Sequence, residues 1–263
     1  MTPPVVLAIA ATDSGGAAGL AADLTTLAAL GVHGACAVTA VTAQDTTAVH
    51  RIIALSADDV SAQIEAVLGD LPVAAIKTGV LGSVDTAKLI ARLARAHPAI
   101  PVVVDPVLVS TTGGELADEE ILDAYRQFVI PVATVITPNR YEAAAILGHD
   151  GPVDGLAREL HALGPAVVLT GGHPDGSRCT DLLVDAGRLH ELPHPAIATD
   201  NDHGTGCTFS AALAAGLAHG HPLEESVRQA QSYVARSLHT SQTWNLGRGR
   251  GSVAHIHTNQ QEF

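Results

Sequence analysis

One short block of the sequence places glycines and a cysteine at a predicted helix start. Residues 203–207 read His-Gly-Thr-Gly-Cys and precede an alanine-rich segment. Glycines before a helix allow close backbone approach and leave amide N–H groups that can stabilise a phosphoryl group. We expect the helix dipole to lower the pKa of the Cys207 thiol, so that it could accept a proton from a substrate hydroxyl. The alternative is a glycine-rich helix entry with an inert cysteine.

Two carboxylates have positions that suit a metal ion. Asp105 ends the buried run at residues 101–105, and Glu142 follows Asn139 by three residues. Carboxylates at strand ends near a phosphate-binding turn are hard oxygen ligands for Mg²⁺, directly or through water. The alternatives are that Asp105 caps a loop and that Glu142 is a solvated helix residue.

A third group of polar residues could bind an organic substrate. Asp23 lies in an otherwise apolar stretch, and Gln44 lies within the run Thr42-Ala43-Gln44-Asp45. The Gln44 amide offers a donor and an acceptor together, which suits the edge of an aminopyrimidine or a similar heterocycle. The alternatives are that Asp23 faces solvent and that Gln44 belongs to a turn.

These residues must be positioned by an alternation of strands and helices. Apolar, β-branched runs predict strands at residues 5–9, 34–41, 49–55, 73–76, 101–105, 133–136 and 166–169, and a hairpin at 180–192. Helices are expected between residues 16 and 30, after Ser56, and at 84–96, 204–219 and 222–240. This alternation predicts an α/β sandwich around a mainly parallel sheet, as one domain over residues 1–263 with a glycine-rich tail from about residue 246.

The segments that follow the predicted strands are rich in polar residues and glycine. They are residues 13–16, 77–79, 105–106, 137–139 and 170–172. Ligands of open α/β sheets bind at the carboxyl ends of the strands. The sequence therefore predicts a ligand site along one edge of the sheet.

Composition and charge limit the kinds of molecule that the chain is expected to bind. The chain has 263 residues, a net charge of −13 and two lysines, Lys77 and Lys88. So acidic a chain is not expected to bind nucleic acid or an anionic membrane, although backbone amides and a cation could still hold a phosphate. Three cysteines without metal-ligand spacing support neither a disulfide framework nor a zinc site. With no apolar run long enough to span a membrane and no signal-peptide pattern, we expect a cytoplasmic protein.

In their order along the chain, these blocks resemble the hydroxymethylpyrimidine/phosphomethylpyrimidine kinases, the thiamine-pathway members of the ribokinase-like superfamily. The resemblance runs from about residue 5 to about residue 240 and includes DSGG, VTAQDT, KTGVL, VVVDPV, ITPNRYEA and HGTGC. HGTGC and VTAQDT are the most specific blocks, because other ribokinase-like kinases usually carry an aspartate where Cys207 stands. The resemblance implies a three-layer α/β/α sandwich and a homodimer.

The resemblance also implies an activity. Members transfer the γ-phosphoryl group of ATP, with Mg²⁺, to 4-amino-5-hydroxymethyl-2-methylpyrimidine, and then phosphorylate the monophosphate to the diphosphate. The residues implied are Gly204, Thr205, Gly206 and Cys207 for the anion hole, with Cys207 as general base; Asp23 and Gln44 for the substrate; Asp105 and Glu142 for Mg²⁺; and Thr137, Asn139 and Thr170 for the phosphate side.

The chain departs from the family pattern at several positions. Ala11 and Ala22 replace a common glycine and glutamine, and Val80 replaces a methionine that commonly lies over the pyrimidine. Lysines common in the family are replaced in the Ser110-Thr111-Thr112 stretch and at Thr170. The first changes leave a pyridoxal kinase of the same superfamily as an alternative. The missing lysines leave a non-catalytic ligand-binding homologue as a third hypothesis.

Overall fold

A central sheet carries most of the chain in the computed structural model, which describes residues 2–108, 118–171 and 178–256. Its strands are β1 (Val5–Ala10), β2 (His33–Val38), β5 (Val73–Thr78), β6 (Val102–Val104), β7 (Val135–Ile136), β8 (Ala166–Leu169), β9 (Arg178–Asp185) and β10 (Arg188–Pro195). They lie in the order β10-β9-β8-β7-β6-β5-β1-β2. The strands from β8 to β2 in this order are parallel, and the β9–β10 hairpin adds antiparallel strands at one edge. The predicted mainly parallel sheet is confirmed.

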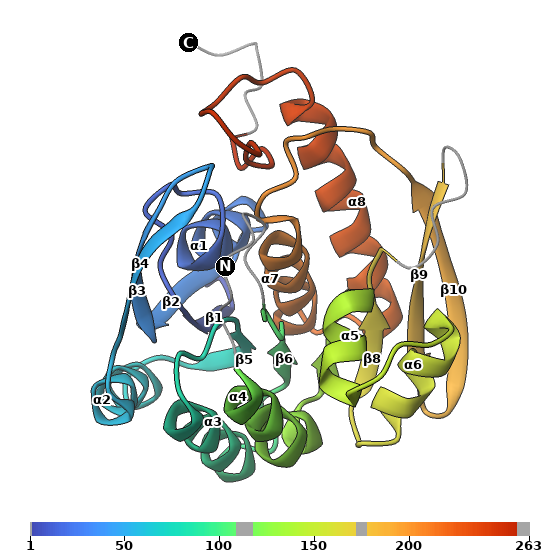
Figure 1. Ribbon diagram of the computed structural model, residues 1–263. Helices are drawn as coiled ribbons and strands as arrows, with labels where there is room; N and C mark the ends of the chain where they lie inside the picture. Colours follow the sequence, from blue (N-terminus) through green and yellow to red (C-terminus); the bar gives the residue numbers. More distant parts are fainter. Residues whose placement is uncertain (1, 109–117, 172–177, 257–263) are drawn as a thin grey trace.

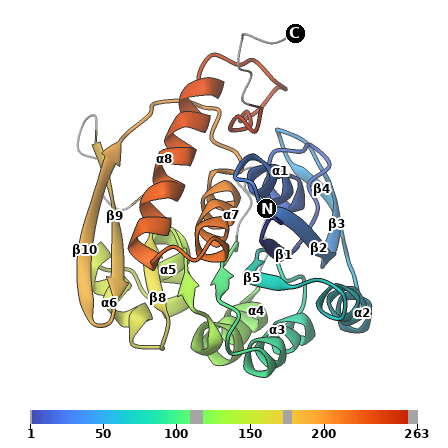
Figure 2. The same cartoon turned by 180° about the vertical axis from the view of Figure 1, so that it is seen from behind.

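Helices cover both faces of this sheet (Figures 1 and 2). One face carries α1 (Gly19–Ala29), α7 (Thr205–Ala218) and α8 (Leu223–Ser241). The other carries α2 (Ala57–Leu68), α3 (Val84–Ala96), α4 (Glu119–Ala124) with its continuation through Val132, α5 (Arg140–Leu147) and α6 (Val153–His161). The helices form a separate hydrophobic core on each face of the sheet. In β1, Val6 packs into one of these cores and the next residue, Leu7, packs into the other. The whole length of β1 is buried, as expected for a strand covered on both sides.

Side-chain caps explain where several helices begin. Ser56 accepts a hydrogen bond from the Asp59 amide at the start of α2, as predicted. Ser83 accepts one in the same way at the start of α3, whose bounds match the prediction at residues 84–96. Asn139 and Glu142 form a reciprocal capping box at the start of α5. The last cap holds Glu142 at a fixed place beside the strand ends.

One predicted strand is split in the structure. The sequence pattern predicts a continuous strand at residues 34–41, but β2 ends at Val38 and β3 (Ala40–Gln44) begins a separate sheet with β4 (Val49–Ala54). The break falls at Thr39, whose hydroxyl donates to the Val80 carbonyl at 2.6 Å. Within the described residues, no helix is both long and apolar enough to cross a membrane.

Candidate active site

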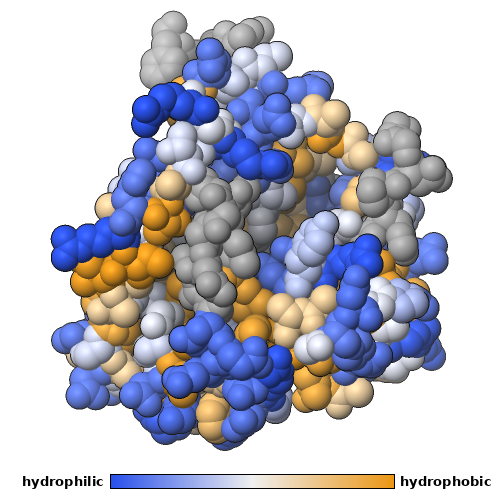
Figure 3. All heavy atoms as spheres, in the orientation of Figure 1, coloured by the Kyte–Doolittle hydropathy of each residue, from blue (hydrophilic) through white to orange (hydrophobic). Residues whose placement is uncertain are grey.

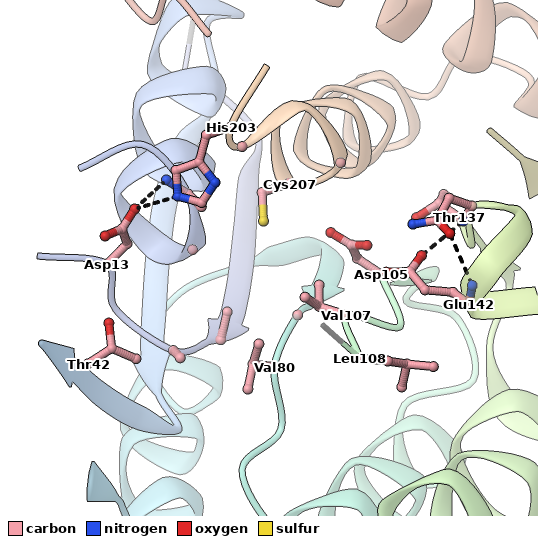
Figure 4. Close-up of a pocket in the computed structure, with 18 of the residues that line it drawn as sticks. Asp13, Thr42, Val80, Asp105, Val107, Leu108, Thr137, Glu142, His203 and Cys207 are labelled. Carbon is pink, nitrogen blue, oxygen red and sulfur yellow. Dashed lines mark hydrogen bonds and ion pairs between the residues drawn. The ribbon is translucent and has the colours of Figure 1, made fainter. Parts of the chain in front are cut away.

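The carboxyl ends of the parallel strands open into one pocket of about 820 Å³. Each of the five predicted strand-end segments contributes lining residues, among them Asp13, Lys77, Asp105, Thr137 and Thr170, although Lys77 lies within β5 rather than after it. The start of α7 and strand β3 form further walls. The opposite walls come from segments that are far apart in the sequence. In Figure 4, Asp13 and Thr42 lie on one side of the pocket and Asp105 and Glu142 on the other.

The start of α7 forms the wall at which the sequence predicts anion binding. Gly204 is its N-cap and has φ of +87°, in the left-handed region that favours glycine. A Cβ atom at Gly204 would lie 1.8 Å from the Ala17 carbonyl oxygen, so only glycine fits. Gly206 and Cys207 follow in the first helical turn and line the pocket. Their amides belong to the turn whose N–H groups lack intrahelical acceptors, which suits a phosphoryl group.

The pKa of the Cys207 thiol differs from the one predicted from the sequence. Its place in the first helical turn predicts a lowered pKa, but burial raises the pKa to about 12, and the nearby carboxylates of Asp105 and Asp23 add to the rise. The positive charge of Lys77 opposes it. The thiol is therefore protonated at neutral pH in this state. In Figure 4 its sulfur points from α7 into the pocket between His203 and Asp105.

A fully buried lysine lies at the base of the pocket. The Nζ atom of Lys77 is 2.8 Å from Oδ1 and 2.9 Å from Oδ2 of Asp23. The family resemblance implies that Asp23 lies near the substrate, and the alternative was that it faces solvent. In the structure its carboxylate is fully buried in α1 and pairs with Lys77, so the solvent-facing alternative is wrong. Lys77, not Asp23, is among the residues that line the pocket. Burial raises the pKa of Asp23 to about 6, against the opposing effect of Lys77.

Asp105 and Glu142 form the acidic wall. Asp105 is buried after β6, and its Oδ2 accepts a hydrogen bond from the Ser210 hydroxyl at 3.0 Å. Glu142 Oε2 accepts from the Asn139 amide at 2.9 Å. Burial, and then the charge of Asp105, raise the pKa of Glu142 to about 8. Both carboxyl groups line the pocket, and Figure 4 shows them on the same side of it. Two adjacent carboxyl groups beside an anion-binding helix start fit Mg²⁺, because its charge would offset theirs.

Gln44 contacts a histidine that the residue pattern alone did not single out. The Gln44 side-chain nitrogen lies 2.9 Å from Nε2 of His203. The same His203 Nε2 lies 3.4 Å from Oδ2 of Asp13. Asp13 also accepts hydrogen bonds from the Gly15 and Ala18 amides. Burial alone would raise the Asp13 pKa, but His203 and these amides lower it. Asp13 begins the DSGG block and His203 begins the HGTGC block. Membership of these two blocks was the signal in the sequence that could have identified both residues as part of the site.

Most of the remaining expected residues line the pocket. They are Ala11, Val80, Thr137, Asn139 and Thr170, whereas Thr205 is not among the lining residues. Asn139 and Thr170 form an isolated parallel β-bridge, in which the Thr170 backbone amide donates to the Pro138 carbonyl at 2.9 Å. Ala22 is buried in α1 and is not among the lining residues. The Ser110-Thr111-Thr112 stretch lies outside the described residues.

A mainly parallel sheet with helices on both faces and a pocket at the carboxyl ends of its strands is the fold of the ribokinase-like kinases. Comparison with known proteins agrees. The family model for phosphomethylpyrimidine kinase matches residues 13–254. The chain is 44% identical to the hydroxymethylpyrimidine/phosphomethylpyrimidine kinase of Rhizobium meliloti (strain 1021), over 96% of this chain and 97% of that protein. The chain therefore belongs to the phosphomethylpyrimidine kinase family.

Solved structures of two activities resemble the fold. An ADP complex of Bacillus subtilis pyridoxal kinase superimposes with a TM-score of 0.88 at 34% identity, covering 96% of this chain and 97% of that one. The phosphomethylpyrimidine kinase of Clostridium difficile 630 gives a TM-score of 0.75 at 32% identity, covering 88% of this chain and 99% of that one. The fold is thus shared by kinases named for a pyrimidine and for pyridoxal.

Proposed function

We propose that the protein phosphorylates 4-amino-5-hydroxymethyl-2-methylpyrimidine and then its monophosphate, using ATP and Mg²⁺. The observation that supports this is one pocket lined by Gly206 and Cys207 of α7, by Asp105 and by Gln44. Figure 4 shows Cys207 and Asp105 next to each other in this pocket. The family to which the chain belongs adds the pyrimidine. A hydroxymethylpyrimidine bound against Gln44 would present its hydroxyl toward α7.

Each wall then has a chemical task. The amides of Gly206 and Cys207 stabilise charge on the transferred phosphoryl group. Cys207 receives the hydroxyl proton as general base, a task that requires its thiol to lose its own proton first. Asp105 and Glu142 would hold Mg²⁺, which supplies charge neutralisation at the phosphate oxygens when bound. The positive charge of Lys77, at the base of the pocket, lowers the pKa of Cys207 and so favours its ionised form.

The direct test is release of ADP in a coupled assay with the pyrimidine, ATP and Mg²⁺. We expect turnover that requires the pyrimidine and is abolished by excess EDTA. Folded protein without turnover would reject the kinase assignment and favour the non-catalytic homologue. Substantial turnover in excess EDTA would reject the Mg²⁺ requirement alone.

Pyridoxal kinase activity is the second candidate. The TM-score of 0.88 to the Bacillus subtilis pyridoxal kinase favours it, and so does Val80, which is shorter than the family's usual methionine. The ratio of kcat/KM for the pyrimidine and for pyridoxal discriminates the two. We expect the ratio to favour the pyrimidine, and a ratio well below one would replace the first assignment by the second.

We also propose a homodimer in the cytoplasm, where ATP is available. The two-stranded sheet exposes Val41, Ile52 and Ile53 at 45%, 43% and 49% of their surfaces. Figure 3 shows a hydrophobic patch on the side where Figure 1 places β3 and β4. A second copy covering this patch would remove it from water. Light scattering should give a dimer for the wild type and for Leu163→Asp, and a monomer for Ile53→Asp; a monomeric wild type would contradict the proposal.

A further inference from the structure

The β9–β10 hairpin brings together three side chains that no step of the proposed reaction uses. Cys179 on β9 pairs directly with His194 on β10. Asp181 stands two residues after Cys179 and so lies on the same face of the sheet. One donor atom from each residue, a sulfur, a nitrogen and an oxygen, lies within 4.8 Å of the other two. Among the described residues, no other group of three such ligands meets this distance.

The orientation of His194 directs one ring nitrogen at the Asp181 carboxylate, where it can hold either a proton or a cation. Its Nδ1 lies 3.2 Å from the Pro195 carbonyl oxygen, and because a carbonyl only accepts, Nδ1 carries a hydrogen. The other nitrogen, Nε2, is shielded from solvent and lies 3.2 Å from Oδ2 of Asp181, whose carboxylate raises the pKa of His194. A histidine that donates Nδ1–H to a carbonyl and offers Nε2 is the usual arrangement of a metal-binding histidine.

Asp181 is held in place by residues around the group. It is buried, with 3% of its surface exposed. Its Oδ1 accepts the Gly171 amide at 2.8 Å, and its Oδ2 accepts Nε2 of Gln231, on α8, at 2.8 Å. Each carboxylate oxygen has a second lone pair, so these contacts leave acceptor capacity for a cation. Contacts of this outer kind orient a metal ligand.

We propose that Cys179, Asp181 and His194 bind one divalent cation of the zinc type, with water as the fourth ligand. A thiolate, an imidazole nitrogen and a carboxylate suit Zn²⁺, whereas Mg²⁺ takes oxygen ligands. Binding releases the thiol proton of Cys179 to solvent, because the thiolate is the ligand. This hairpin site shares no ligand with the proposed Mg²⁺ site. It adjoins the active-site pocket through Gly171, which lines that pocket and donates to Asp181.

Co²⁺ is the probe that reports thiolate coordination directly, through a charge-transfer absorption in the near ultraviolet. The variant C36S/C207S keeps Cys179 as the sole thiol, and adding Cys179→Ser gives a matched variant without thiols. We expect the first variant to bind one equivalent of Co²⁺ with this absorption, displaced by Zn²⁺, and the second to lack it. Absence of the absorption in the first variant, or its persistence in the second, would overturn the proposal.

Affinity measured on the otherwise unaltered chain gives an independent test. We expect His194→Gln to weaken Zn²⁺ binding by at least about 10-fold, and Gln231→Leu, which removes an orienting contact, by about 10- to 100-fold. His239→Gln, an exposed histidine of α8, is the control and should bind as the wild type does. Circular dichroism confirms that each variant is folded. Unchanged Zn²⁺ affinity in folded His194→Gln would mean that His194 and Asp181 share only a proton, and would reject the site.

Discussion

The ammonium group of Lys77 lies 2.8 Å from Oδ1 of Asp23, and neither side chain has any exposed surface. On its other side, the same ammonium lies 3.8 Å from Oδ2 of Asp105. Burial opposes the charge of Lys77, but the two carboxylates more than offset this and raise its pKa. Lys77 is thus a permanent cation at the base of the pocket of a chain with a net charge of −13.

Replacing Lys77 by methionine should strongly destabilise the protein. The change leaves two buried carboxylates without their cation, which typically costs about 3–5 kcal/mol. For a chain of this length we expect the Tm to fall by about 10 °C. The other lysine provides the control, since Lys88 is exposed and lies 3.6 Å from exposed Asp85. Lys88→Met should change stability by less than about 1 kcal/mol.

A second variant separates charge from packing at Lys77. In Lys77→Met/Asp23→Asn, one of the two uncompensated carboxylates becomes neutral, so the double variant should melt at a higher temperature than Lys77→Met. Thermal unfolding followed by circular dichroism measures both. A double variant that melts lower would show that the lost volume and contacts, not the unpaired charge, dominate the effect.

Gly204→Ala should move the start of α7. The added Cβ would meet the Ala17 carbonyl oxygen at 1.8 Å, so the helix start or its neighbour must shift. Displacements of about 1 Å near reacting groups cost on the order of 10²-fold in rate, and we expect such a loss in kcat. Gly220, at the other end of α7, has a similar φ of +82°, but a Cβ added there would meet no atom within 4 Å. Gly220→Ala should therefore lose only about 1–2 kcal/mol of stability and keep kcat; equal kcat losses would contradict this account.

The hydrogen bonds of Asp13 predict a pH-dependent contribution to stability. His203 and backbone amides hold the folded-state pKa of Asp13 below its ordinary value, although burial opposes them. A lowered folded pKa means that the contribution is complete above the unfolded-state pKa and is lost as the pH falls through the folded-state pKa. Asp13→Asn should therefore destabilise the protein by about 1–2 kcal/mol at neutral pH, and by progressively less in acid.

Urea unfolding at several pH values measures this difference. Asp70→Asn, at an exposed residue that follows α2, is the matched control and should follow the wild type throughout. A difference between wild type and Asp13→Asn that stays constant from neutral to strongly acidic pH would contradict an ionic role for Asp13.

Cys207 variants test the proposed general base. If the thiol receives the hydroxyl proton, Cys207→Ala should lower kcat on the order of 10²-fold, and Cys207→Ser should also be impaired because an alcohol ionises less readily. Cys36→Ala, in β2, is the control and should keep its kcat. Normal kcat in Cys207→Ala would reject the base role while leaving the kinase assignment intact, because the α7 amides would remain.

Local sequence patterns were sufficient to predict most helices and strands, and to predict which edge of the sheet carries the pocket. Buried β-branched runs predicted the positions of β1, β5, β6 and β8, and the strand-end rule located Lys77, Asp105 and Thr170 at one pocket. The pattern could not reveal the break at Thr39, because residues 34–41 are apolar on both sides of it. At the break, the Thr39 hydroxyl donates a hydrogen bond to Val80, which is distant in the sequence.

The electrostatic state of the site also depends on distant residues. The ion pair of Asp23 could not be predicted from its neighbours in the sequence, because its partner, Lys77, lies 54 positions away. The first helical turn, taken alone, predicts a lowered pKa for Cys207. Burial, together with Asp105 and Asp23, outweighs that local effect, and none of these contributions is visible in the residues around Cys207.

The most direct measurement is steady-state ADP release by the wild-type protein with ATP, Mg²⁺ and either the hydroxymethylpyrimidine or pyridoxal. The account predicts Mg²⁺-dependent turnover with a kcat/KM that is higher for the pyrimidine than for pyridoxal. Folded protein that releases no ADP above background with the pyrimidine would contradict it.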